Sequence, residues 1–340
     1  MLGTLSRKRE EGEGNSKTRI REDWMKLTRT IVLAAAALFI APSAHAQDKL
    51  HFGKAFPGLF QFTPVDLGIA KGFFAKRGLD VEITNFFGDA KQQQAYTAGA
   101  IDMGIGGGAG MAFIAKGSPI IAVAEAAGPP LGITLASWAD TPYKTVDDLK
   151  GKIVTGASVG DQTEWFVRQL SILHGWGPNG FDYEPLGATE AQIAALKTHQ
   201  VAAAPLDITT AVTLESAGQA RIVVRFGKVI TAYINHVITA SNDEIAKHPD
   251  DVRKFLAGWF ESAVYFKTHK DEAVKFTAAL LKKPEPIISR VFDESAPMIT
   301  DNGHFDPKGL AAIRQSLVDT KILDTAPDMS KLYTEKFLPN

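Results

Sequence analysis

The chain has 340 residues and no cysteine, and its 37 lysines and arginines nearly balance 38 aspartates and glutamates, for a formal net charge of −1. This length fits about two domains, and the balanced charge excludes the basic surface typical of nucleic-acid-binding proteins. Without cysteine we expect no disulfide, no thiolate metal site and no lipid anchor on cysteine. The histidine spacing matches no zinc motif, so neither a metal nor a cofactor is predicted.

Residues 25–46 have the pattern of a secretory signal peptide. A short basic stretch at 25–29 precedes the apolar run 31–40, and Ala44-His45-Ala46 fits a cleavage site of the small-x-small type. The apolar run is shorter than the roughly 20 residues that a membrane-spanning helix needs. We predict that residues 1–46 are removed by cleavage after Ala46, with translation starting at Met1 or Met25. The predicted location is the periplasm, without a lipid anchor.

Strands and helices are predicted to alternate through the first part of the remaining chain. Apolar runs bounded by glycine, proline or polar residues predict strands at 49–54, 79–84, 101–105 and 119–124. The spacing of apolar residues predicts helices between them, at 65–76, 89–98 and 109–115. Such alternation is typical of an α/β fold, with a mostly parallel sheet flanked by helices.

Gly128-Pro129-Pro130 interrupts this alternation, and we predict that the chain crosses there into a second lobe. A new series follows, with strands at 132–138, 152–155, 183–186, 201–204 and 221–225, and helices at 145–149, 161–173, 189–197 and 207–217. A strand at 233–240 carries the chain back, and the C-terminal part from 242 is almost entirely helical. We therefore predict one lobe of residues 47–131 and 237–340, and another of residues 132–236.

Two segments, 93–107 and 192–207, share one plan: a helix, a turn, a short strand of small residues and a loop that opens a helix. Two lobes of similar design would each present such a loop to a shared cleft, where open α/β sheets bind ligands. In the first lobe the loop is the run Gly106-Gly107-Gly108. Its backbone can approach a ligand closely, and the helix start that follows offers N–H groups to an anion.

The glycine run also matches a dinucleotide-binding pattern. Gly104-Ile105-Gly106-Gly107-Gly108-Ala109 has the spacing G-x-G-x-x-A, and Glu125 follows about 20 residues later, where an acid binds a ribose. Against this interpretation, the run follows a third predicted strand instead of opening a domain. A dinucleotide-binding enzyme is therefore kept as a lesser alternative.

A second motif suggests a serine hydrolase. Gly156-Ala157-Ser158-Val159-Gly160 matches G-x-S-x-G between a predicted strand and a predicted helix, as a nucleophile elbow requires. Asp207 and His236 follow in the chain order of an α/β-hydrolase triad. No His-Gly-Gly segment for an oxyanion hole precedes the motif. A hydrolase that uses Ser158, Asp207 and His236 is the main alternative to a binding function.

Three stretches resemble the nitrate/sulfonate/taurine-type solute-binding proteins of ABC transporters. They are residues 64–82, with Gly72-Phe73-Phe74 and Gly78-Leu79, residues 98–104, and residues 146–154. The resemblance implies a type II periplasmic binding protein fold, with two α/β lobes joined by two crossing segments and closed by the ligand. Thiamine-pyrimidine synthase-like enzymes share that fold but rely on a cysteine-rich segment, so the absence of cysteine favours binding over catalysis.

The resemblance also implies, by position, which residues bind the ligand. The first lobe would supply Phe60, Gln61, Phe62, Gly107 and Gly108. The second lobe would supply Ser158, Asp161, Gln162, Thr189 and Asp207, and the return crossing would supply Tyr233.

The implied function is that of a monomeric periplasmic receptor that delivers a small solute to a permease and its ATPase. An anionic solute, such as a sulfonate or nitrate, would be bound by N–H groups around Gly107 and Ser158. If the Asp207 carboxylate enters the cleft, an amine-bearing solute fits better, such as a taurine-like aminosulfonate or a pyrimidine. The phenylalanines near residue 60 suggest that part of the solute is apolar or heteroaromatic.

Overall fold

The computed structural model describes residues 47–339. The predicted signal peptide, its cleavage site after Ala46 and the two candidate start residues lie outside this range and stay predictions. Within the described range, none of the helices combines the length and the apolar character needed to cross a membrane.

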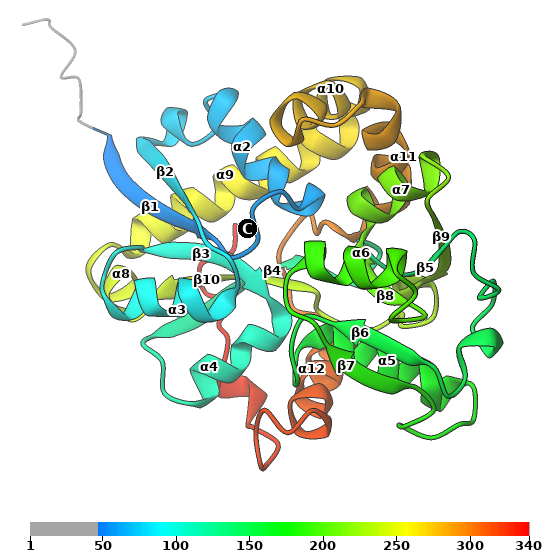
Figure 1. The fold of residues 1–340 in the computed structure, drawn as a ribbon. Coiled ribbons are helices and arrows are strands. Elements are labelled where there is room, and N and C mark those ends of the chain that lie inside the picture. Colours follow the sequence, from blue (N-terminus) through cyan, green and yellow to red (C-terminus); the bar gives the residue numbers. More distant parts are fainter. Residues whose placement is uncertain (1–46, 340) are drawn as a thin grey trace, which may run out of the picture. The chain divides into compact units, whose positions relative to one another are not determined.

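The first sheet has five strands in the order β2-β1-β3-β10-β4 (Figure 1). Strand β1 runs parallel to β2 and β3, whereas β10 runs antiparallel to β3 and β4. Strand β10 follows the return crossing and joins the sheet in the opposite direction. The strands are β1 (Asp48–Lys54), β2 (Leu79–Asn85), β3 (Met103–Gly107), β4 (Ile120–Ala127) and β10 (His236–Ser241).

The other strands repeat this arrangement. Strand β5 pairs antiparallel with β8 and β9, and β6 pairs parallel with β7. A parallel bridge from Val154 to Ala203 joins β6 to the start of β8, which gives the order β7-β6-β8-β5-β9. The strands are β5 (Ile133–Trp138), β6 (Ile153–Gly156), β7 (Asp182–Pro185), β8 (Ala204–Asp207) and β9 (Ala220–Arg225).

The predicted α/β class and the predicted repeat of one plan are confirmed. Helix α3 (Asp89–Thr97) leads into β3, and α6 (Thr189–Lys197) leads into β8, at equivalent places in the two sheets. The pairing is mixed rather than mostly parallel, because β5 and β10, which follow the two crossings, run against their neighbours. The proposed lobe boundaries stay a prediction.

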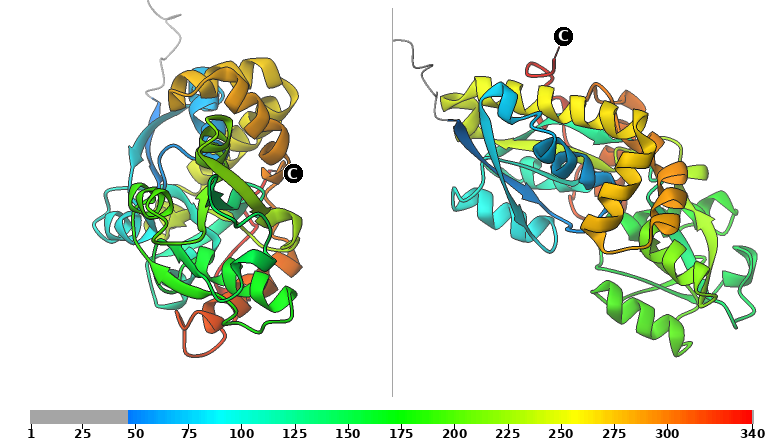
Figure 2. Two further views of the ribbon diagram at one scale, coloured as in Figure 1. Left: turned by 45° about the vertical axis from the view of Figure 1, so that its right-hand side comes forward. Right: turned by 90° about the horizontal axis from the view of Figure 1, so that it is seen from above.

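Helices cover both sheets (Figure 2). Those interleaved with the strands are α2 (Thr63–Ala70), α3, α4 (Met111–Ala115), α5 (Gln162–Leu173), α6 and α7 (Ile208–Ser216). The C-terminal helices are α8 (Asn242–Lys247), α9 (Pro249–Thr268), α10 (Lys270–Leu281), α11 (Glu285–Ser295) and α12 (Pro307–Asp319). The predicted helical C-terminal part is therefore confirmed.

Helix α9 supplies the largest apolar contact of the first sheet. Its Phe255 stacks on Phe52 of β1, with ring centroids 4.6 Å apart, and Trp259 lies next to them with no exposed surface. Helix α12 instead packs beside α5, where Trp165 Nε1 donates to Asp319 Oδ2 over 3.0 Å. The C-terminal helices thus contact elements of both sheets, because their apolar faces are buried on two different surfaces.

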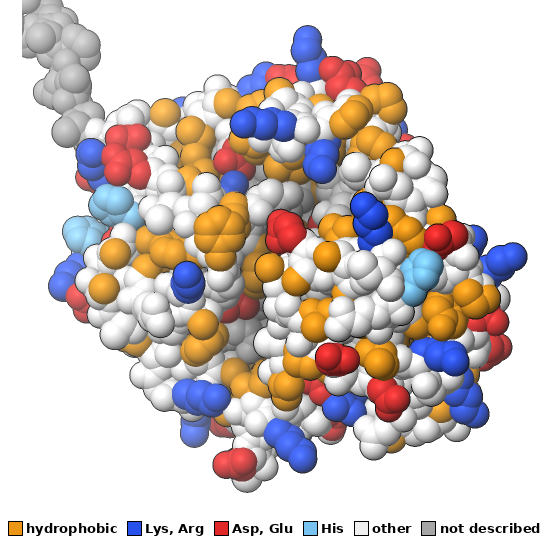
Figure 3. Space-filling view, in the orientation of Figure 1, with side chains coloured by type: hydrophobic (Ala, Val, Ile, Leu, Met, Phe, Trp, Pro, Cys, Tyr) orange, Lys and Arg blue, Asp and Glu red, His pale blue; other side chains and the backbone are white. Residues whose placement is uncertain are grey.

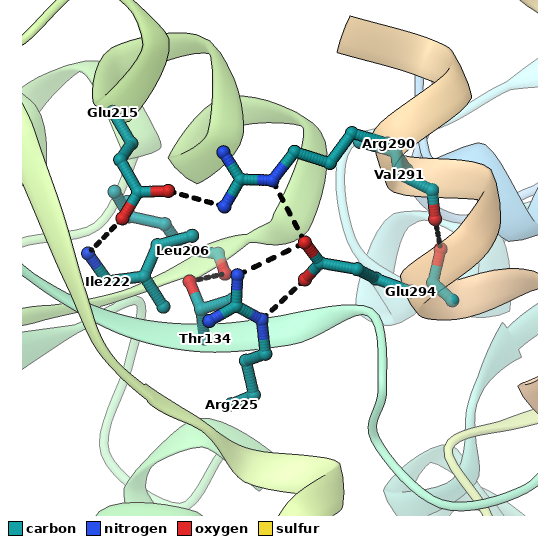
Figure 4. Close-up of polar contacts among 9 residues, drawn as sticks. Thr134, Leu206, Glu215, Ile222, Arg225, Arg290, Val291 and Glu294 are labelled. Atoms are coloured by element: carbon teal, nitrogen blue, oxygen red, sulfur yellow. Dashed lines mark hydrogen bonds and ion pairs between the residues drawn. The ribbon is translucent and has the colours of Figure 1, made fainter.

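A chain of ion pairs ties α11 to the second sheet (Figure 4). Glu294 of α11 accepts hydrogen bonds from Arg225 of β9 and from Nε of Arg290, the latter over 2.9 Å. Arg290 Nη2 continues to Glu215 Oε2 of α7 over 2.5 Å. Burial opposes ionisation of Glu294, but the hydrogen bonds and charges of the two arginines outweigh it and lower its pKa. A shared, half-buried carboxylate of this kind stabilises more than an isolated surface pair does.

Replacing Glu294 tests this network. In Glu294→Gln, two half-buried guanidinium groups lose their common charge partner, so the free energy of unfolding should fall by about 1–2 kcal/mol. Urea unfolding measures the change. The matched control, Asp250→Asn, removes an exposed pair with Arg253 and should change the free energy by less than about 0.5 kcal/mol. Equal losses of unfolding free energy in both variants would show that the network adds no stability beyond that of an exposed ion pair.

Candidate functional site

The candidate site lies where the strands of the two sheets end. The end of β3 and the one-turn helix after it form the glycine loop, residues 106–110, and β6 runs toward the start of α5. The two loops face each other, since Gln162 Oε1 lies 3.7 Å from the position that a Cβ on Gly107 would take. The surface is hollowed between the regions of α3 and α6 (Figure 3). This is the position in which open α/β sheets hold ligands.

Asp89, the first residue of α3, lies directly on the glycine loop. Its Oδ1 accepts a hydrogen bond from the N–H of Gly107 over 3.0 Å. A Cβ on Gly106 would collide with this carboxylate, and one on Gly107 would come within 3.0 Å of its Oδ2. The glycines therefore let a carboxylate of the chain itself come close to the backbone, as glycine does for a ligand.

Burial raises the pKa of Asp89 to about 6, and the Gly107 N–H offsets only part of this rise. The residue as a whole is half-buried. Among the described residues no hydrogen bond reaches its second oxygen, Oδ2. A carboxylate that ionises with difficulty and has a free acceptor atom is typical of a functional position.

The second loop, at the start of α5, carries its own carboxylate. Asp161 caps the helix, with Oδ1 accepting from the N–H of Glu164 over 2.9 Å and Oδ2 accepting from the N–H of Ser158 over 3.0 Å. Ser158 is exposed and Asp161 half-buried. Beside them, Gln162 Oε1 is buried without a hydrogen-bond partner among the described residues. This amide oxygen points into the space between the loops.

Asp207 at the end of β8 caps α7. Its Oδ1 accepts from the N–H groups of Thr209 and Thr210 over 2.9 and 3.2 Å, and its Oδ2 accepts from the Thr210 hydroxyl. Both oxygens are thus engaged by the helix that follows. Thr189, the first residue of α6, is exposed.

Phe60, Gln61 and Phe62 form a one-turn helix between β1 and α2, and all three side chains are buried. The ring of Phe60 packs against those of Phe266 and Phe292, and that of Phe62 meets His236 edge-on. Gln61 Nε2 lies 2.9 Å from His236 Nε2. The structure places these residues in the packing behind the site, not on the hollowed surface.

His236 of β10 contacts Gln61, Asn235 and Gly106 behind the site. Its Nε2 accepts from the amide groups of Gln61 and Asn235, each over 2.9 Å, and its Nδ1 faces the carbonyl of Gly106 at 3.3 Å. Burial lowers the pKa of His236 to about 3, so the ring is neutral. With Nε2 engaged by two amides and Asp207 bound to α7, the predicted triad with Ser158 is not assembled.

Tyr233 lies on the return crossing, just before β10. Its ring stacks on Trp165, with centroids 5.2 Å apart, and is 1% exposed. Burial raises the pKa of this phenol, and the negative charges of Asp161 and Asp89 raise it further. The hydroxyl lies near that of Ser316 but makes no hydrogen bond of normal geometry among the described residues. Tyr233 thus lies within electrostatic reach of both loops.

The dinucleotide alternative finds no support in the loop geometry. Gly104 and Gly106 belong to β3 itself, and a Cβ on Gly104 would meet the carbonyl of Gly53 at 2.9 Å. Gly108 packs against the return crossing, where its N–H donates to the carbonyl of Asn235 over 3.0 Å. Glu125 is buried and accepts from the N–H of Asp306 over 2.9 Å. These glycines and Glu125 are therefore engaged in contacts within the protein, and they are not arranged to bind a pyrophosphate.

Three comparisons place the chain among known proteins. Residues 59–273, more than half of the chain, match the family described as NMT1/THI5 like. A curated relative, the riboflavin-binding protein RibY of Chloroflexus aurantiacus, is 22% identical over 90% of this chain and 91% of its own length.

Solved structures share the fold. The periplasmic aliphatic sulphonate binding protein SsuA of Escherichia coli superposes with a TM-score of 0.71 at 17% identity, over 84% of this chain and 97% of that one. The desulfurization enzyme DSZB superposes with a TM-score of 0.62 at 14% identity, over 85% and 97%. These likenesses confirm the predicted periplasmic binding protein fold, and the fold alone accommodates both binding proteins and an enzyme.

Asp89 is the residue of this site that sequence reasoning missed. The prediction of a helix from residue 89 treats this residue as a cap, whereas Gly88 occupies the cap position and Asp89 turns toward the glycine loop. The available signal was its position after β2, at the same sheet edge as the end of β3.

The variant Asp89→Asn tests the electrostatic state of this site. Because the pKa of Asp89 is raised to about 6 from an unfolded value of about 3.9, its ionisation costs stability above that pH, by up to about 3 kcal/mol. Asparagine avoids this cost. The free energy of unfolding at pH 7.5 should therefore be higher in the variant than in the wild type, and the difference should vanish near pH 4.

Urea unfolding between pH 4 and 8 measures this effect. Asp80→Asn, at an exposed aspartate of β2, is the matched control and should follow the wild type. A loss of stability in Asp89→Asn at pH 7.5 would contradict the assignment and identify Asp89 as a structural helix-start acid.

Proposed function

Because the chain belongs to the NMT1/THI5-like family and has the periplasmic binding protein fold, we propose that it is the solute receptor of an ABC importer. It binds a small organic solute between lobes of residues 47–131 with 237–340 and 132–236. It then presents the closed, loaded form to a permease and its ATPase. The mature protein is a periplasmic monomer, exported by a signal peptide that is cleaved after Ala46.

The observation that carries the proposal is the meeting of two strand-end loops, one from each sheet. The glycine loop after β3 and the start of α5 after β6 come from sheets with the same strand order. Gln162 Oε1 faces Gly107 across the space between them. A solute that contacts both loops favours the closed arrangement, which is how domain closure is driven.

Catalysis is not part of this proposal. The Ser158–Asp207–His236 alternative lacks its central contact, because His236 Nε2 is bound to two amide groups and Asp207 is engaged by α7. The chain also has no cysteine, on which the synthase-like enzymes of this fold rely. An activated-serine probe at Ser158 separates the two functions: labelling would establish a nucleophile there and contradict a receptor without catalysis.

A broad binding experiment tests the receptor. Native mass spectrometry of gently purified protein, followed by thermal-shift measurements with sulfonates, carboxylates, nitrate, pyrimidines and flavins, should reveal one tight ligand. At a ligand concentration 100-fold above the Kd, binding stabilises the fold by about 2.7 kcal/mol, which is readily measured. The absence of any ligand across this panel would contradict the receptor function.

The variant Gln162→Ala locates the binding site. It removes an amide between the two loops, so affinity for the ligand found should fall at least about tenfold, as expected for a lost buried hydrogen bond. The matched control is Gln200→Ala, at an exposed position after α6, which should bind as the wild type does. Equal affinity of all three proteins would place the solute elsewhere.

A further inference from the structure

Several N–H groups at the strand ends donate to carboxylates of the chain itself. Anions bind proteins at the N–H groups of helix starts and glycine loops. Here the Gly107 N–H donates to Asp89 and the Ser158 N–H to Asp161. The Thr209 and Thr210 N–H groups, at the third strand end, donate to Asp207. The N–H groups of Gly107 and Ser158 themselves are therefore occupied by carboxylates in this structure.

The charge of these loops is negative. Asp89, Asp161 and Asp207 each bring a carboxylate to a strand end, and the causes of the shifted Asp89 pKa, burial and the Gly107 N–H, include no cation. The lysine at the end of β1, Lys54, is 5% exposed and pairs with Asp66 over 2.8 Å. A sulfonate at this place would face carboxylates without a counter-charge, which costs binding energy.

Among residues 47–339, buried side-chain atoms near the strand ends without a hydrogen-bond partner include Gln162 Oε1, the Tyr233 hydroxyl and Thr209 Oγ1. Of the polar atoms near the loops, Gln162 Oε1 and Asp89 Oδ2 are two acceptors that lie next to Gly107. Buried acceptors without a partner cost free energy until a donor satisfies them. They therefore fit a ligand that brings N–H groups.

We propose that the solute presents an N–H donor to Asp89, as a primary amine, an amidine or the amino group of a heteroaromatic ring, and that this subsite rejects oxyanions. The inference rests on the receptor function proposed above and names the class of its ligand. A site built around buried acceptors discriminates strongly against an analogue without the donor, because its own polar groups are then left unpaired.

The proposal predicts a pH dependence of binding. The phenol of Tyr233 feels the charges of both Asp89 and Asp161 of α5, while His236 behind Gly106 is neutral. Since Asp89 protonates near pH 6, an N–H ligand should bind about tenfold more weakly at pH 5.0 than at pH 7.5. An oxyanion would show the opposite sign and bind more tightly as the carboxylate is neutralised.

The experiment uses matched probes that differ by the donor. Thermal shift and calorimetry with the full chain compare taurine with ethanesulfonate, and 4-aminopyrimidine with pyrimidine, within a library of amines, amidines, aminoheterocycles and amine-free oxyanions. The tightest wild-type ligand should carry the N–H donor. Asp89→Asn should weaken binding of that ligand at least about 100-fold. It should also abolish any pH dependence of binding beyond the part caused by titration of the ligand itself. The control Asp80→Asn should bind as the wild type does.

Three outcomes are separated. An amine-free oxyanion that binds tightest, and tighter still in Asp89→Asn or at pH 5.0, would overturn this inference and leave the receptor function standing. A donor-bearing ligand whose affinity ignores both Asp89→Asn and pH would overturn the role of Asp89. A library without any ligand would overturn the receptor function and this inference with it.

Discussion

The site depends on one contact, the carboxylate of Asp89 resting on the glycine loop that ends β3. The Gly107 N–H holds Oδ1 at 3.0 Å, and a Cβ on Gly106 would collide with the same oxygen. This contact changes how the glycine loop is interpreted. In this structure the glycines receive an acid from α3, whose second oxygen is the acceptor that we propose for the solute. The N–H groups of a helix start favour an anion, whereas the carboxylate placed here favours a hydrogen-bond donor.

The arrangement of the two sheets puts the opposing loop in place. In each sheet a parallel pair is joined to a strand of small residues and then to an antiparallel crossing strand. The carboxyl ends of strands from both sheets meet across one space, since Gln162 after β6 lies opposite Gly107 at the end of β3. The return crossing supports the site from behind, through His236 against Gly106 and the carbonyl of Asn235 against Gly108.

Sequence reasoning reached the fold but only part of the site. The alternation of strands and helices, the repeated plan and the start of α5 follow from local patterns, and the structure confirms them. The burial of Phe60 and Phe62 could not be predicted, because it depends on Phe266, Phe292 and His236, far away in the sequence. The local sequence does not determine what these rings contact, since an aromatic residue in a loop can face a ligand or a distant helix.

The carboxylates show a second limit of sequence reasoning. An aspartate before or at a helix start can cap that helix or contact a ligand, and the local sequence is the same in both cases. Asp161 and Asp207, predicted as ligand contacts, cap α5 and α7. Asp89, expected to cap α3, instead reaches the neighbouring loop. Only the tertiary arrangement, which places β3 beside the start of α3, distinguishes these roles.

A crystal structure of the wild-type protein with its ligand at pH 7.5 tests the central claim most directly. The account predicts a ligand N–H group within about 3 Å of the Asp89 carboxylate, with Gly107 still bonded to the other oxygen and Gln162 and Tyr233 in contact with the same ligand. A ligand oxyanion seated on the Gly107 N–H, with the Asp89 side chain turned away, would contradict it.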